Sequence, residues 1–206
     1  MKRFFRGLIA IICVVIMVFA AHTDKMSKLS GTENSISGHI SAKTEEFIIK
    51  EFGSAKSPAQ LMAMVSAFSM KNFVYDGRVV GVLQVIDVNK FVFEQNFHGV
   101  CLDFSVFTKT VFSVICEHNN FEKVACYTVL GQTPFSEGHA VNYIAFPLTE
   151  DLTAVYFLDL TDVVAAAKAG KAPKHIEGEI VEKDKVQGHI KAHFEEKFDY
   201  TFTILD

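Results

Sequence analysis

The chain has 206 residues, of which 50% are hydrophobic and 20 are Phe, so it has ample apolar material for the core of one globular domain. Its formal net charge is −4 and its lysines and arginines form no basic stripe, which argues against a nucleic-acid-binding protein. The sequence contains neither internal repeats nor a glycine-rich phosphate-binding loop.

The N-terminus has the pattern of an export signal. Lys2, Arg3 and Arg6 precede a small and apolar run over residues 7–21, and Ala20 suits a cleavage site. The run is shorter than the ~20 residues that a membrane-spanning helix needs. We therefore expect residues 1–21 to be the cleaved signal peptide of a secreted or extracytoplasmic protein, with an uncleaved membrane anchor as the alternative. Residues 22–42 predict a flexible leader, and residues 43–206 a single domain.

Two helices are predicted at the start of this domain. The first begins at Ser41 or Thr44 and ends at Gly53, and the second begins at Ser57 with Pro58 in its first position. The pattern of residues 79–93 does not distinguish a helix from a strand.

Cys101 precedes an apolar run over residues 102–116 that has no glycine or proline, which predicts a helix with this cysteine at its N-terminus. The unpaired amides and the dipole of a helix start favour the thiolate, the nucleophilic form of cysteine. Asp103 in the first turn suits the dipole, and we interpret it as structural. If the signal is removed, Cys101, Cys116 and Cys126 remain. The last two are expected to be buried free thiols, with a disulfide between them as the alternative.

Three strand-like runs follow at residues 121–130, 139–146 and 154–160, with short links that favour an antiparallel meander. Residues 161–174 predict a short helix, residues 179–198 a helix with apolar residues four apart, and residues 200–205 a terminal strand. The meander packed against the Cys101 helix would give an α+β fold.

A cysteine, a histidine and an aspartate follow one another along the chain as Cys101, His139 and Asp159, the constellation of a catalytic triad. The motifs around them are Tyr75-Asp76, residues 99–104 (Gly-Val-Cys-Leu-Asp-Phe), His139-Ala140 and an aromatic-rich strand that ends at Asp159. In this order the motifs, over residues 60–162, resemble the transglutaminase-like superfamily, whose members fold like papain-type cysteine proteases. The chain departs from that pattern at Val141 and Leu160, where the family often has an aromatic residue and a proline, and it contains no Trp.

The resemblance implies an exported thiol hydrolase, a cysteine peptidase or amidase, in which Cys101 attacks an acyl carbon, His139 moves the proton and Asp159 orients His139. It also implies an oxyanion role for Gln95, which lies six residues before Cys101. The alternatives are amine transfer by a transglutaminase and a non-catalytic binding module on the same fold. A protein or peptide substrate is expected, with no cofactor.

A metal site is not expected. His189 and His193 lie one helical turn apart and could bind a metal, but no third ligand is evident, so a solvated helix face is the favoured interpretation.

Register arguments predict how His139 and Asp159 meet. If they lie directly opposite each other in an antiparallel hairpin, the turn is centred on Thr149, where Pro147 and the polar residues after it suit a strand end and a loop. Val141, Tyr143, Val155 and Phe157 would then share their face of the sheet, and this face is expected to meet the start of the Cys101 helix.

Overall fold

The structure is a computed structural model that describes residues 40–77, 87–133, 136–171, 176–198 and 201–205. The predicted signal peptide lies outside the described residues, as does most of the predicted leader. Within the described residues, no helix is long and apolar enough to cross a membrane.

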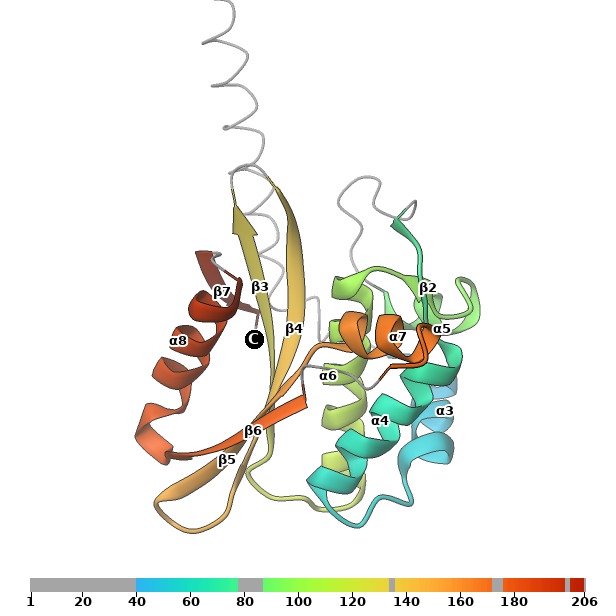
Figure 1. Cartoon of the computed structure of the whole chain (residues 1–206). Helices are drawn as coiled ribbons and strands as arrows, with labels where there is room; N and C mark the ends of the chain where they lie inside the picture. The colour runs from blue at the N-terminus through green and yellow to red at the C-terminus, as the bar shows by residue number, and fades with distance from the viewer. Residues whose placement is uncertain (1–39, 78–86, 134–135, 172–175, 199–200, 206) are drawn as a thin grey trace, which may run out of the picture.

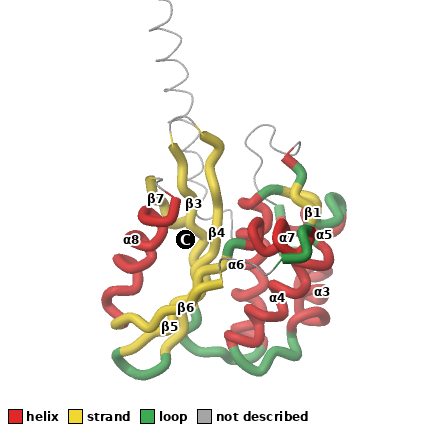
Figure 2. The backbone as a smooth tube through the Cα atoms, viewed as in Figure 1, coloured by secondary structure: helices red, strands yellow, loops and turns green. Residues whose placement is uncertain are grey.

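The described residues form three layers: a group of five helices, an antiparallel sheet and one further helix on the opposite face of the sheet (Figures 1 and 2). The helices of the first layer are α3 (Ala42–Phe52), α4 (Pro58–Asn72), α5 (Val88–Phe93), α6 (Cys101–His118) and α7 (Leu160–Lys168). The sheet strands are β3 (Ala125–Thr133), β4 (Ser136–Pro147), β5 (Leu152–Leu158), β6 (Ile176–Glu182) and β7 (Thr201–Leu205), and α8 (Val186–Phe198) covers the far face. Two short parallel strands, β1 (Val74–Tyr75) and β2 (His98–Gly99), and the 3-10 turn η2 (Lys183–Lys185) complete it. The α+β architecture is as predicted.

The helix starts follow local capping rules. The Ser41 hydroxyl accepts the Thr44 amide at 3.2 Å at the start of α3, and Ser57 caps α4 with Pro58 in its first turn. Between these helices and α6 lies a dense group of phenylalanine rings, in which Phe104 and Phe107 are fully buried and Phe73 lies 4.6 Å from Phe104 between ring centroids. This group fixes α6 within the helical layer.

The five strands run in the order β6-β5-β4-β3-β7, with β3, β4 and β5 as an antiparallel meander. The predicted meander is confirmed. The prediction of one helix over residues 179–198 is wrong in its first part, because residues 176–182 pair with β5 as the edge strand β6. The apolar residues four apart lie on α8, which begins only at Val186.

The predicted register of the β4–β5 hairpin is wrong by two residues. Tyr143 pairs with Phe157 and Pro147 with Thr153, so the loop between the strands covers residues 148–151. In this register the position opposite Asp159 belongs to Val141 rather than to His139. A shift of two residues preserves the alternation of side chains, so the residues predicted to share a face still do so.

We expected this shared face to meet the start of α6, but it does not. Val141, Tyr143, Val155 and Phe157 pack against α8, through Val186, Ile190 and Phe194. The alternate residues, among them Ile144 and Leu158, face the helical layer and join its core. Because the pattern of β4 is apolar on both faces, both faces are covered and the sheet is the middle layer.

The start of α6 depends on a close approach between Gly99 and Asp103. The Asp103 carboxylate accepts the Val100 amide at 2.8 Å, which supplies a partner to an amide just before the helix. A Cβ atom on residue 99 would lie 2.7 Å from Asp103 Oδ2 and 2.8 Å from its Cβ. Gly99 is therefore required for Asp103 to close over the start of the helix, which explains physically why these two residues flank Cys101.

Gly99→Ala should lower the free energy of unfolding by roughly 1–3 kcal/mol, because the new methyl group displaces Asp103 from the Val100 amide. Gly188→Ala is the matched control, because a Cβ atom there meets nothing within 4 Å and the exposed glycine lies in α8. It should raise stability by about 0.5–1 kcal/mol. Urea denaturation of both variants measures this, and equal effects of the two substitutions would refute the explanation.

Candidate active site

Cys101 is the first residue of α6, directly after β2. Its residue surface is 8% exposed, and it packs with Leu130 and Ala140 from β3 and β4. The sulfur lies 3.9 Å from the Gly138 carbonyl oxygen. The thiol thus lies where the start of α6 meets the sheet, next to the chain segment that carries His139.

His139 lies on β4 at a point where, among the described residues, the strand is paired on one side only. It pairs with Gly131 of β3, whereas the pairing with β5 begins only at Asn142. The imidazole Nε2 lies 2.7 Å from Asp159 Oδ2, with the two side chains 21% and 6% exposed. The hydrogen bond expected between these residues is present, although it runs diagonally from the end of β5 rather than straight across a ladder.

Asp159 has two structural roles. It is the N-cap of α7, where Oδ1 accepts the amides of Thr161 at 3.0 Å and Asp162 at 3.2 Å. Its other oxygen binds His139. The cap explains why the carboxylate points in a fixed direction at the end of a strand, and it keeps the second oxygen aimed at the imidazole.

The surroundings of His139 favour its protonated form. Burial lowers the pKa of the imidazole, but the hydrogen bond to Asp159 and the contact with the Cys101 thiol outweigh burial and raise the pKa to about 10. Nε2 is engaged by Asp159, which leaves Nδ1 as the second ring nitrogen, and the Cys101 sulfur lies within hydrogen-bonding distance of the Gly138 carbonyl. Asp159 and His139 therefore form a carboxylate–imidazole pair, and the Cys101 thiol lies next to the segment that carries His139.

Gln95 is partly buried in the turn between α5 and β2. Its backbone amide donates to the Lys90 carbonyl and its carbonyl accepts the His98 amide, both at 2.9 Å. The next residues, Asn96 and Phe97, both have positive φ, at 47° and 62°. The contacts described for Gln95 are those of its backbone, so its oxyanion role stays a prediction.

The other two described cysteines are unsuited to nucleophilic chemistry. Cys116 and Cys126 are free, without a disulfide between them. Burial raises the pKa of Cys116 to about 11, and it raises the pKa of Cys126 further. Both thiols remain protonated at neutral pH.

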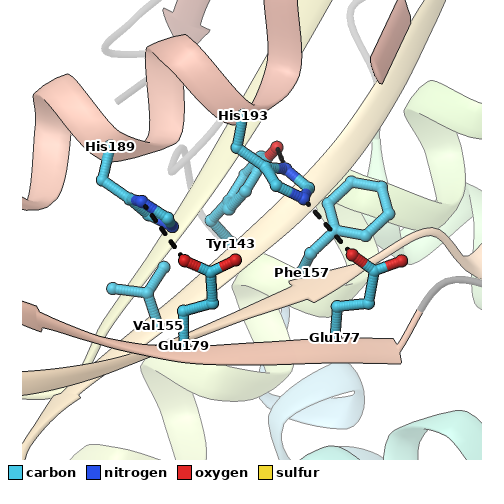
Figure 3. Close-up of a pocket in the computed structure, with 7 residues that line it drawn as sticks. All are labelled: Tyr143, Val155, Phe157, Glu177, Glu179, His189 and His193. Atoms are coloured by element: carbon cyan, nitrogen blue, oxygen red, sulfur yellow. Dashed lines mark hydrogen bonds and ion pairs between the residues drawn. The ribbon is translucent and has the colours of Figure 1, made fainter. Parts of the chain in front are cut away.

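His189 and His193 do not form the solvated face that we expected. Their side chains are 21% and 17% exposed and point toward the sheet (Figure 3). His193 Nδ1 lies 2.7 Å from the Tyr143 hydroxyl and its Nε2 3.5 Å from Glu177, while His189 lies 3.8 Å from Glu179. Among the residues that the structure describes, no group of three or more histidine, cysteine or acidic side chains could hold a metal ion. These contacts join α8 to β4 and β6.

Phe198 is a neighbour of His139 that sequence reasoning did not identify. The two ring centroids lie 5.2 Å apart, and Phe198 also packs 4.9 Å from Phe194 and 6.0 Å from Phe157. Its place in the series of apolar residues on α8 was evident from the sequence. The spacing of apolar residues on a helix predicts which side chains are buried, but not which neighbour each of them contacts.

No family model and no curated protein sequence matches this chain. One solved structure with a similar backbone is described as a "Putative Cysteine Protease from Cytophaga hutchinsonii", at a TM-score of 0.40 and 16% sequence identity. The match covers 69% of this chain and 51% of that one, so the chain spans about half the length of that protein.

Cys101 should be the cysteine that reacts with iodoacetamide at pH 7, because burial raises the pKa of the other two described thiols, Cys116 and Cys126. Peptide mapping should find Cys116 and Cys126 unmodified. His139→Ala should slow the modification of Cys101 about 10-fold or more at pH 7, and the difference should vanish near pH 10, where a thiol ionises unaided. His98→Ala, a histidine three residues before Cys101, is the control. An equal effect of the two substitutions would contradict the pairing of Cys101 with His139.

The two roles of Asp159 should separate by substitution. Asp159→Asn keeps an oxygen to cap α7 but removes the charge beside His139, whereas Asp159→Ala removes both. Since the folded-state pKa of His139 is raised from 6.5 to about 10, its stabilising contribution is complete below about pH 6.5 and is lost as the pH rises through about 10. The stability lost in Asp159→Asn should therefore shrink over that range.

Asp159→Ala should cost about 1 kcal/mol more than Asp159→Asn at every pH, because only it loses the cap. Denaturant unfolding at pH 6.5, 8 and 10 measures both differences. A loss in Asp159→Asn that grows with pH would show that the His139 proton is not what the carboxylate stabilises.

Proposed function

We propose that this protein is a cysteine peptidase or amidase of the transglutaminase-like, papain-like type, in which Cys101, His139 and Asp159 are the catalytic triad. The observation that supports this most directly is the 2.7 Å hydrogen bond between His139 and Asp159, made beside a thiol that begins a helix. The carboxylate is also locked as the N-cap of α7, so it orients the imidazole without needing to move.

The proposed reaction starts from the thiolate of Cys101 and the imidazolium of His139. The thiolate attacks the acyl carbon of an amide, and the negative charge that develops on the oxygen faces the Cys101 amide at the free start of α6. Gln95 is proposed as a second donor to this oxygen. His139 gives its proton to the leaving amine as the C–N bond breaks, which leaves a thioester on Cys101.

Water then resolves the thioester. Neutral His139 takes a proton from the attacking water, and the C–S bond breaks. The acid product is released, and the thiolate of Cys101 and the imidazolium of His139 are regenerated. Asp159 stabilises the imidazolium in both halves of the cycle and does not itself take up the proton.

Hydrolysis is proposed over transfer to an amine. The chain contains no Trp, so it lacks the indole that lines the acyl site of animal transglutaminases. Export also belongs to the proposal and rests on the basic start and the apolar run of residues 1–21.

The test uses the purified chain with a fluorescent protein substrate, in the presence of a labelled primary amine. We expect new N-termini or free ammonia to be released without incorporation of the label. Cys101→Ala should abolish this activity, and His139→Ala should lower kcat by about 10²-fold or more. Cys116→Ala, which removes a thiol outside the triad, is the matched control. Incorporation of the amine faster than hydrolysis would favour acyl transfer, and release that persists in Cys101→Ala would exclude the proposed nucleophile.

A further inference from the structure

The imidazole of His139 is held by few contacts within its own sheet. Its strand pairs on one side with β3, but the ladder to β5 does not extend to this residue. In a complete antiparallel ladder, side chains on the neighbouring strand flank each residue and limit its rotamers. Among the described residues, none of β5 lies opposite His139 in the ladder, so the ring is supported by residues of other elements.

Phe198 of α8 packs against the imidazole ring of His139 and supports it. Its ring centroid lies 5.2 Å from that of His139, with an angle of 55° between the planes. Asp159 binds Nε2, and Phe198 packs against the ring. An apolar ring in that place limits both the rotation of the imidazole and the access of water to its hydrogen bond.

Helix α8 is fastened to the sheet in a way that keeps Phe198 in place. His193 links the Tyr143 hydroxyl to Glu177 (Figure 3). Lys197 Nζ lies 2.9 Å from Glu177. The Lys197 ammonium also lies 4.8 Å from the centre of the Phe157 ring. These contacts belong to the last two turns of the helix, immediately before Phe198, so the position of this ring follows from the docking of α8.

We infer that Phe198 is a positioning residue for His139, supplied by a C-terminal segment that lies beyond the region of family resemblance. The inference rests on the proposed function of His139 as the triad base. Phe198 confines the imidazole to the rotamer in which Nε2 meets Asp159 and Nδ1 faces Cys101. The C-terminal helix thereby becomes part of the catalytic apparatus without touching the reacting atoms.

The test compares three substitutions of Phe198 with one of Phe194. Phe194 is the same residue type one turn earlier on α8, is fully buried, and packs in the cluster between α8 and the sheet. Phe194→Leu should lower stability without changing the chemistry of Cys101. Phe198→Ala should slow the modification of Cys101 by iodoacetamide roughly 3- to 10-fold at pH 7, with no difference near pH 10, and should lower kcat by a similar factor at unchanged KM. Phe198→Tyr should restore both, and Phe198→Leu should restore them in part.

The outcomes separate this inference from the proposed function. If His139→Ala slows Cys101 but Phe198→Ala and Phe198→Leu do not, Phe198 only packs and the inference fails while the triad stands. If Phe194→Leu changes the pH dependence as much as Phe198→Leu does, the effect belongs to the stability of α8, and the inference fails. If His139→Ala itself leaves Cys101 unchanged, the triad and the inference fail together.

Discussion

The arrangement of this molecule depends on how Asp159 divides its two carboxylate oxygens. One oxygen accepts the first amides of α7, and the other binds the imidazole of His139. The first contact ties the aspartate to the helical layer and the second ties it to the sheet, so the two layers meet at this side chain. A buried carboxylate costs free energy unless its hydrogen bonds are made, and here both oxygens are used. The hydrogen bonds that compensate for burying the Asp159 carboxylate also orient the imidazole of His139.

A second carboxylate positions Cys101 by the same physics. Asp103 reaches back to the Val100 amide at the start of α6, and the absence of a side chain at Gly99 lets it do so. Helix starts expose amides without partners, and acidic side chains satisfy them. The candidate site therefore stands on two helix starts, with Cys101 at one and the partner of His139 at the other. Each start is defined by residues within a few positions in sequence, which allows a precise geometry to be built from local interactions.

Local interactions are also what the sequence predicted well. Ser41, Ser57 and the uninterrupted run after Cys101 marked helix starts that the structure confirms, because caps and periodicity act within one or two turns. The β4–β5 register was placed two residues away because a polar loop tolerates either centre, whereas the two buried faces of the strands exclude a shift of one. Residues 179–182 were assigned to a helix because edge strands carry charges that resemble a solvated helix face. The docking of α8 on the face that holds His139 is a contact between distant segments, and apolar spacing alone does not choose the partner surface.

The early end of β5 connects these observations. In the observed register the residue opposite His139 would be Thr161, but the chain has already turned into α7 after Asp159. A longer strand would have filled the ladder beside His139 and separated the imidazole from the helical layer. Because the strand stops at Leu158, no described residue of β5 pairs with His139, and Phe198 packs against the imidazole from α8. The Asp159 cap lies at both the end of the strand and the start of α7, so the residue that binds the imidazole of His139 also ends the ladder beside it.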